Sequence, residues 1–290
     1  MAGLDARHLR KVLSYQRSEV TEHAIYRRLA RRTSGPNRTV LEAIAADELR
    51  HARQWQDLTG RSARPRTLQV WLFVLLSRAL GLSFALKLME RAEGVAQREY
   101  GQLSSMLRPA RELAEEEREH EAALLGLLQE EHLRYVGAIV LGLNDALVEL
   151  TGGLAGLTLA LQRTRLIALS AIVVGLAAAM SMAASTYLST KAEKSDKAPL
   201  RSAAYTGAAY LLTVVLLVAP FLAIAQPFVA LGCALLASIL IIASFNFYTA
   251  VAMDRPFGRQ FMEMAAISLG VAAASFGLAS VARMLLGVDV

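Results

Sequence analysis

Residues 136–161 read VGAIVLGLNDALVELTGGLAGLTLAL, and they mark a sharp change in the character of the chain. Of the 25 acidic residues, 18 precede residue 136, as do 22 of the 31 lysines and arginines. Hydrophobic residues make up 54% of the 290-residue chain, more than the roughly 45–50% of an ordinary soluble domain. We therefore expect two parts: a charged domain at residues 1–135 and a membrane domain at residues 136–290.

Five apolar stretches follow one another in the second part, and each is long enough to cross a hydrocarbon core of about 30 Å as a helix. They lie near residues 136–161, 166–190, 203–225, 228–252 and 261–287. The connections on one side carry six lysines and arginines, whereas those on the other side and the C-terminal end carry three. The positive-inside rule then predicts a multi-pass protein of the cell (inner) membrane, with the first part in the cytoplasm and the C-terminus outside.

One earlier stretch, from Leu68 to Met89, is also about as long as a bilayer is thick. It contains Arg78 and Gly81, and a span here would place the carboxylates on its two sides in different compartments. We interpret this stretch as a long buried helix, with Trp71 and its neighbours as candidates for contact with the membrane surface.

Two classes of function are excluded by composition. Cys233 is the single cysteine, so a disulfide framework, a cysteine-based zinc site and a rubredoxin-type iron centre cannot form. Any metal must be held by oxygen and imidazole. The net charge of +6 is spread over both parts without a basic block or interleaved aromatic residues, which argues against nucleic-acid binding.

The first part has the pattern of four helices, at residues 5–33, 36–59, 67–106 and 109–134. Acidic residues and histidines recur along them in the order Glu, Glu-x-x-His, Glu, Glu-x-x-His, one element on each helix. The residues in this order are Glu19, Glu48, His51, Glu93, Glu117 and His120, with Glu90 as an additional candidate ligand.

A glutamate and a histidine three residues apart project from the same face of a helix. One such pair on a charged helix usually marks a solvated face, so the complete order is what favours a metal site. A four-helix bundle that supplies these elements assembles a carboxylate-bridged two-metal site, as in ferritin-like di-iron proteins. Carboxylates combined with imidazoles suit iron or manganese.

The segment from Glu19 to Tyr26, together with the two Glu-x-x-His helices, resembles the rubrerythrin branch of the ferritin-like superfamily over nearly all of residues 1–135. The resemblance implies a ferritin-like bundle whose di-iron centre oxidises Fe(II) with oxygen or peroxide. The rubredoxin tail that usually donates electrons in this family is missing. This departure argues against peroxide reduction over many turnovers.

Acidic residues also occur inside the first apolar stretch, where Asp145 and Glu149 alternate with glycines at helical intervals of three and four. The glycines are Gly142, Gly152 or Gly153, and Gly156. Ionisable groups at this depth normally face a watery or protein-lined path, and small residues let another helix approach closely. We interpret the stripe as a cation path at a helix contact, across a two-fold axis between subunits. Alternatively, both acids are hydrated near the cytoplasmic end and cap the helix.

The second apolar stretch places Met182 on one face with Ser185 or Thr186 and Ser189. A methionine in a membrane helix most often packs, but its thioether is a soft ligand that favours a transition metal over magnesium or calcium. Glu263, near the cytoplasmic start of the fifth stretch, is a further candidate for the metal entry path, or else an ordinary solvated glutamate.

Asn144-Asp145, paired with Ser181-Met182-Ala183, is similar to the vacuolar iron transporter family over residues 136–290. The resemblance implies a five-helix dimer that exchanges Fe(II) or Mn(II) for protons, with Asp145 and Met182 lining the pathway and Glu149 as a proton or metal site. The acidic insertion that plant-type members carry after the second span is replaced here by the short KAEKSDKAPLR, residues 191–201. The first part is then the candidate for capturing the metal.

The predicted fold is all-α: a ferritin-like four-helix bundle followed by a five-helix transmembrane domain, similar to the fusions described as membrane-bound ferritins. The predicted function is export of Fe(II), with Mn(II) as a second substrate, by a homodimeric proton antiporter that serves iron homeostasis and protection from oxidative stress. The cytoplasmic di-iron domain is expected to capture, oxidise or sense iron before transport. The alternative is a membrane-anchored ferroxidase or peroxide scavenger that does not transport.

Overall fold

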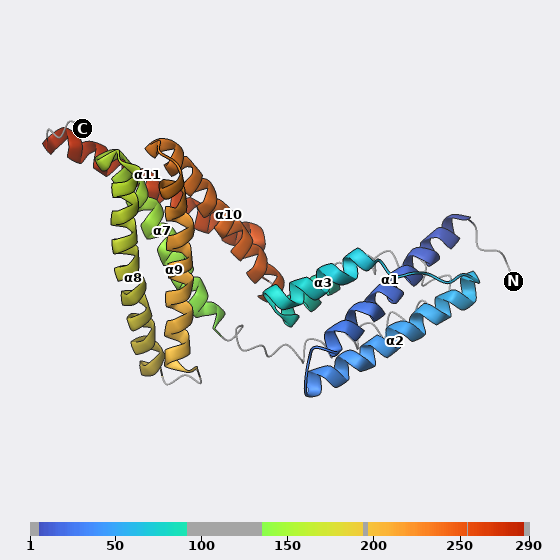
Figure 1. Ribbon diagram of the computed structural model, residues 1–290. Helices are drawn as coiled ribbons and strands as arrows, with labels where there is room; N and C mark the ends of the chain where they lie inside the picture. Colours follow the sequence, from blue (N-terminus) through green and yellow to red (C-terminus); the bar gives the residue numbers. More distant parts are fainter. Residues whose placement is uncertain (1–5, 92–134, 194–196, 254, 287–290) are drawn as a thin grey trace. The chain divides into compact units, whose positions relative to one another are not determined.

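The computed structural model describes residues 6–91, 135–193, 197–253 and 255–286, and all the regular structure in these ranges is helical. The chain divides into two compact units, Met1–Glu130 and Glu131–Val290. An all-α fold is therefore confirmed for the described part of the chain, whose helices are labelled in Figure 1. The helix expected at residues 109–134 lies outside the described residues.

Two long helices form the framework of the first unit. Helices α1 (Ala6–Ala30) and α2 (Pro36–Thr59) pack side by side. The turn between them follows from its sequence: Gly35 adopts a φ of 68°, which glycine tolerates without steric cost, and Pro36 occupies the first turn of α2, where a missing N–H does no harm. The interior between the helices holds fully buried apolar side chains such as Ile25 and Leu41.

The stretch from Leu68 to Met89 does not form the single long buried helix expected from its apolar length. Helix α3 (Thr67–Leu80) ends at Gly81, whose φ of 97° and ψ of 158° a side-chain-bearing residue rarely adopts, and residues 82–91 are again helical. Helix α3 exposes large apolar side chains, including Leu68 at 85% and Trp71 at 58%. The prediction failed because apolar length does not report a helix break at one glycine.

Length also explains why α3 is no sixth span. Its 14 residues rise about 21 Å, less than the roughly 30 Å of a hydrocarbon core. Among the described residues, five helices are long and apolar enough to cross a membrane, and all of them lie in the second unit. They are α7 (Val136–Leu161), α8 (Thr164–Ala192), α9 (Pro199–Ala223), α10 (Pro227–Met253) and α11 (Phe257–Leu286). The prediction of five apolar helices long enough to cross a membrane is thus confirmed.

Helix α7 is the centre of the second unit, because it contacts α8, α9, α10 and α11. Its leucines Leu147, Leu150 and Leu154 are buried in a core shared with Tyr210 of α9 and Ile242 of α10. Helices α8 and α9 pack on each other along much of their length. The acidic residues of α7 are therefore held on the helix that has the most neighbours in this unit.

Gly142 and Gly152 of α7 face two different helices of the same chain. A Cβ at Gly142 would overlap the backbone carbonyl oxygen of Thr206 on α9, and one at Gly152 would lie 2.9 Å from Cγ1 of Val271 on α11. Gly153 has no atom within 4 Å of such a Cβ. Close approach to α9 and α11 therefore accounts for Gly142 and Gly152 within one subunit.

We expect Gly142→Ala to destabilise the second unit by about 1–3 kcal/mol, the usual cost of overfilling a packed contact. The obstructing atom belongs to the backbone, so α9 must move as a whole. Gly153→Ala is the matched control, and it should be neutral or slightly stabilising because alanine favours a helix. Thermal unfolding of both variants in one detergent measures the difference. Equal midpoints for the two variants would contradict the close α7–α9 contact.

Candidate metal centre and transport path

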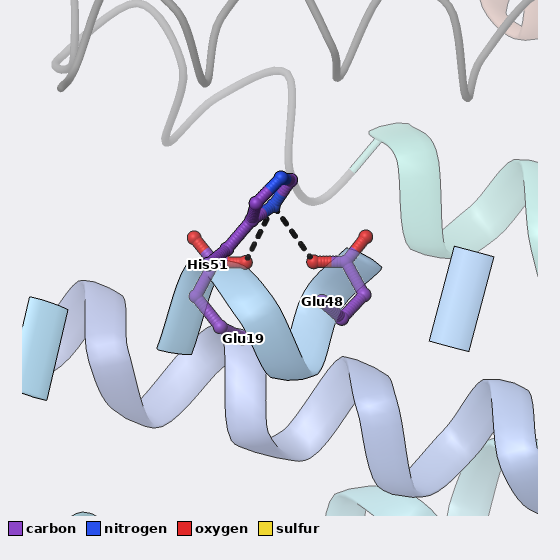
Figure 2. A group of neighbouring side chains, drawn as sticks. All are labelled: Glu19, Glu48 and His51. Carbon is purple, nitrogen blue, oxygen red and sulfur yellow. Dashed lines mark ion pairs between the residues drawn. The ribbon is translucent and has the colours of Figure 1, made fainter. Parts of the chain in front are cut away.

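Three predicted ligands, Glu19 from α1 and Glu48 and His51 from α2, meet in the interior of the first unit. One ligand atom from each lies within 4.8 Å of the other two. Nδ1 of His51 is 3.8 Å from Oε2 of Glu19 and 3.6 Å from Oε2 of Glu48. Figure 2 shows the imidazole held between the two carboxylates. The spacing of Glu48 and His51 places both on one face of α2, and the packing of α1 brings Glu19 opposite them.

The three side chains are almost completely buried, with exposures of 4% for Glu19, 2% for Glu48 and 0% for His51. The fully buried indole of Trp55 donates a hydrogen bond from Nε1 to Oε1 of Glu19, at 3.3 Å. Trp55 follows His51 by four residues on α2, and its ring is tilted against that of Tyr15, with 6.2 Å between centroids. The Trp55 indole, itself packed against Tyr15, thus fixes one oxygen of Glu19.

Burial raises the pKa of the Glu19 carboxyl well above its usual range, and the nearby Glu48 carboxylate raises it further, while the adjacent imidazole of His51 acts in the opposite direction. A buried pair of carboxylates is expensive because each disfavours the ionised form of the other. A bound cation reverses this balance by favouring the ionised forms. Two carboxylates and one imidazole are also the donor set that iron and manganese accept, so these residues fit a metal.

Among the described residues, no other predicted ligand joins this cluster of three. Glu90 lies in the helical residues 82–91, is partly buried, and does not belong to the group of three. Glu93, Glu117 and His120 lie outside the described residues. The structure therefore describes the first Glu and the first Glu-x-x-His of the predicted order, and a second metal position stays a prediction.

In the second unit, Asp145 and Glu149 lie one turn apart in the middle of α7. Asp145 is half-buried, and Glu149 is exposed on the surface of the single chain. Nine residues separate Asp145 from the first residue of α7, about 14 Å along the helix axis. The alternative in which these acids cap the helix is wrong, because α7 begins at Val136 with Tyr135 in the capping position.

Tyr210 is a residue of this site that the sequence reasoning missed. It lies on α9, is fully buried, and donates a hydrogen bond from its hydroxyl to Oε2 of Glu149 on α7. A tyrosine in the middle of an apolar helix needs a polar partner for its hydroxyl, so the sequence alone indicated that Tyr210 makes a hydrogen bond inside the unit. Only the packing of α9 on α7 identifies the partner.

Met182 of α8 is half-buried and lines a cavity of about 330 Å³ between α7, α8 and the start of α9. Thr186, one turn further along α8, lines the same cavity. Glu263 is exposed near the start of α11 and does not line this cavity. Met182 thus lines an open space and Glu263 does not, and a transport role stays a prediction for both residues.

The start of the second unit is similar to a known protein family. Residues 136–198 match the VIT family model. This VIT segment comprises α7, α8 and the connection to α9, and so contains Asp145, Glu149 and Met182. No curated protein matches the chain.

The VIT segment suggests that the second unit transports metal ions, iron or manganese, across a membrane. Its five long apolar helices fit a multi-pass membrane protein. The match covers the two helices that carry the acid pair and Met182, and it agrees with the resemblance to vacuolar iron transporters seen in Asn144-Asp145 and Ser181-Met182-Ala183. The first unit has no part in this match.

Proposed function

We propose that this protein exports Fe(II) from the cytoplasm by proton antiport, with Mn(II) as a second substrate. The observation that carries the proposal is the match of residues 136–198 to the VIT family model, a segment that includes Asp145 and Glu149 in the middle of α7. Carboxylates at this depth are costly unless they serve an ion path. A purely anchoring domain has no use for them.

Asp145 is the proposed binding residue for the metal at mid-span, and Met182 is its softer partner on α8. A carboxylate attracts any divalent cation, whereas a thioether favours transition metals. Glu149 carries the counter-transported proton, and Tyr210 orients its carboxyl through the hydrogen bond from α9. Two neighbouring acids on one helix can thereby hold a metal and a proton in turn.

The exposure of Glu149 supports a homodimer, because a carboxylate on the outer surface of a single chain would otherwise face lipid. A second copy packed against this face of α7 would cover it. The six positive residues on one side of the spans support a cytoplasmic first unit and an external C-terminus.

The first unit is the proposed capture domain, a ferritin-like bundle with a di-iron centre. Glu19, Glu48 and His51 would hold one ion, and Glu93, Glu117 and His120 would complete the pair. Bound iron would supply ferroxidase chemistry at this place. The chain's own contribution is a buried donor set that keeps water out, with one oxygen of Glu19 fixed by Trp55. Capture and export together serve iron homeostasis and protection from oxidative stress.

Proteoliposomes with an imposed proton gradient test the transport proposal. We expect Fe(II) uptake driven by an opposing proton gradient, and a fall of about tenfold when a protonophore collapses that gradient, because antiport draws its driving force from protons. Alkalinisation of the lumen, read with a pH dye, should accompany metal uptake, because protons leave as the metal enters. Metal flux equal to that of empty liposomes would favour the membrane-anchored ferroxidase, and flux that ignores the gradient would exclude antiport.

A further inference from the structure

Half of the residues that line the cavity beside Met182 carry a hydroxyl group. The cavity lies where α7 begins, α8 ends and α9 begins. Five serine or threonine side chains contribute to its wall: Ser185, Thr186, Ser189, Thr190 and Ser202. Its volume of about 330 Å³ is large compared with the about 30 Å³ that each water molecule takes up in the liquid. A space of this size and polarity holds several water molecules.

Thr186 differs from the other buried threonines of the second unit. Its side-chain oxygen has no hydrogen-bond partner among the described residues, although the residue is only 7% exposed. By contrast, the hydroxyl of Thr158 donates to the carbonyl oxygen of Leu154 at 2.6 Å, and that of Thr213 donates to Ala209 at 2.9 Å. A buried hydroxyl without a hydrogen-bond partner lowers the stability of the fold by about 1–3 kcal/mol. We therefore expect the Thr186 hydroxyl to bind a partner inside the cavity.

The thioether of Met182 favours a metal cation as that partner. The inner wall carries the thioether of Met182, which can accept but cannot donate a hydrogen bond and therefore offers nothing to an anion. Glu193 and Lys197 both line the cavity and offset each other in charge. The end of α8 contributes a negative helix dipole and the starts of α7 and α9 contribute positive ones, so the helix dipoles do not select the sign of the ligand.

We propose that this cavity is a hydrated vestibule in which a divalent cation exchanges water for protein oxygen, with the Thr186 hydroxyl as its ligand one helical turn from Met182. The inference rests on the proposed transport function and adds a binding step ahead of Asp145. Hydroxyl ligands are neutral, so they replace water without holding the ion too tightly to move on. Fe(II) and Mn(II) are the expected occupants.

Transport kinetics test the role of the Thr186 hydroxyl. Thr186→Val keeps the branched shape and removes the oxygen, and we expect the apparent KM for Mn(II) to rise about three- to tenfold with a smaller change in the maximal rate. Thr186→Ser should restore the original KM. Thr158→Val is the matched control, since it removes a buried hydroxyl that is already bonded within its own helix. Unchanged KM in Thr186→Val would overturn the assignment.

Cysteine labelling tests the cavity without relying on transport. Because Cys233 is the single cysteine, Cys233→Ala gives a cysteine-free background. In that background Ser185→Cys should react with a membrane-impermeant maleimide, and Mn(II) should slow the reaction about fivefold, an effect lost when Thr186→Val is added. Ser244→Cys, exposed in the middle of α10, is the control and should stay unlabelled.

The labelling and transport experiments test the vestibule and the proposed function separately. Labelling of Ser185→Cys as slow as that of Ser244→Cys would show a dry cavity, and labelling that Mn(II) does not slow would show that no cation binds there. Either result overturns the vestibule even if the wild-type protein transports metal. Protection by Mn(II) in a protein that shows no flux would instead preserve the site and defeat the transport proposal.

Discussion

Replacing Asp145 by asparagine is expected to reduce Fe(II) flux into proteoliposomes to the background of empty liposomes, a loss of at least about tenfold. Two unit charges 4 Å apart attract by about 4 kcal/mol at an effective dielectric constant of 20, and a divalent ion at mid-span depends on such attraction after losing its water. About a third of that energy already corresponds to a tenfold change. The amide keeps the size of the side chain and removes only its charge.

Asp145→Glu is the matched control, because it keeps the carboxylate on the same face of α7. It should retain measurable flux, although the longer side chain moves the charge. Thermal unfolding in detergent shows whether both variants fold, and the half-buried position of Asp145 gives no reason for collapse. Wild-type flux in Asp145→Asn, with the fold intact, would remove Asp145 from the path.

The second prediction with a large expected effect is the loss of bound iron from the first unit. Glu19→Gln combined with Glu48→Gln should lower the iron bound per chain to less than about a tenth of the wild-type amount, because one imidazole alone does not hold a cation and the ligand set loses both its charges. The change is isosteric, and it replaces carboxylates that are costly to bury in the metal-free state. Elemental analysis after desalting measures the iron content.

Glu42→Gln provides the control for this experiment. Glu42 lies on the same helix α2 but is exposed and paired with Arg38 at 2.8 Å, so its substitution should leave the iron content unchanged. Circular dichroism should show equal helix content in both proteins. Iron retained in full by the double variant would defeat the metal assignment of Glu19 and Glu48, whatever the second unit does.

The spans were predictable from the sequence because their signal is local. A run of about twenty apolar residues must form a helix in lipid, since no other arrangement satisfies the backbone within one segment. The start of α7 at Val136 and the extent of α2 follow from the same kind of local signal, together with Gly35-Pro36. Likewise, a spacing of three places Glu48 and His51 on one face without any knowledge of the fold.

Other features could not be predicted because they depend on which helix lies opposite. Gly81 ends α3 by adopting one unusual pair of backbone angles, and the length of the apolar stretch does not indicate this helix break. Gly142 and Gly153 look alike in sequence, yet only Gly142 meets a backbone carbonyl. Glu90 was a reasonable ligand by spacing, but the described residues place it outside the cluster of three.

By itself the sequence determined the all-α character, the five spans and the positions of acids along them, because hydrophobic length and helical period act within one segment. The tertiary structure decided that Tyr210 bonds Glu149, that Glu19 meets His51, and that Thr186 faces a cavity. These pairings join helices that are distant in the chain. They arise from side-chain shape and packing across an interface, which no single segment encodes.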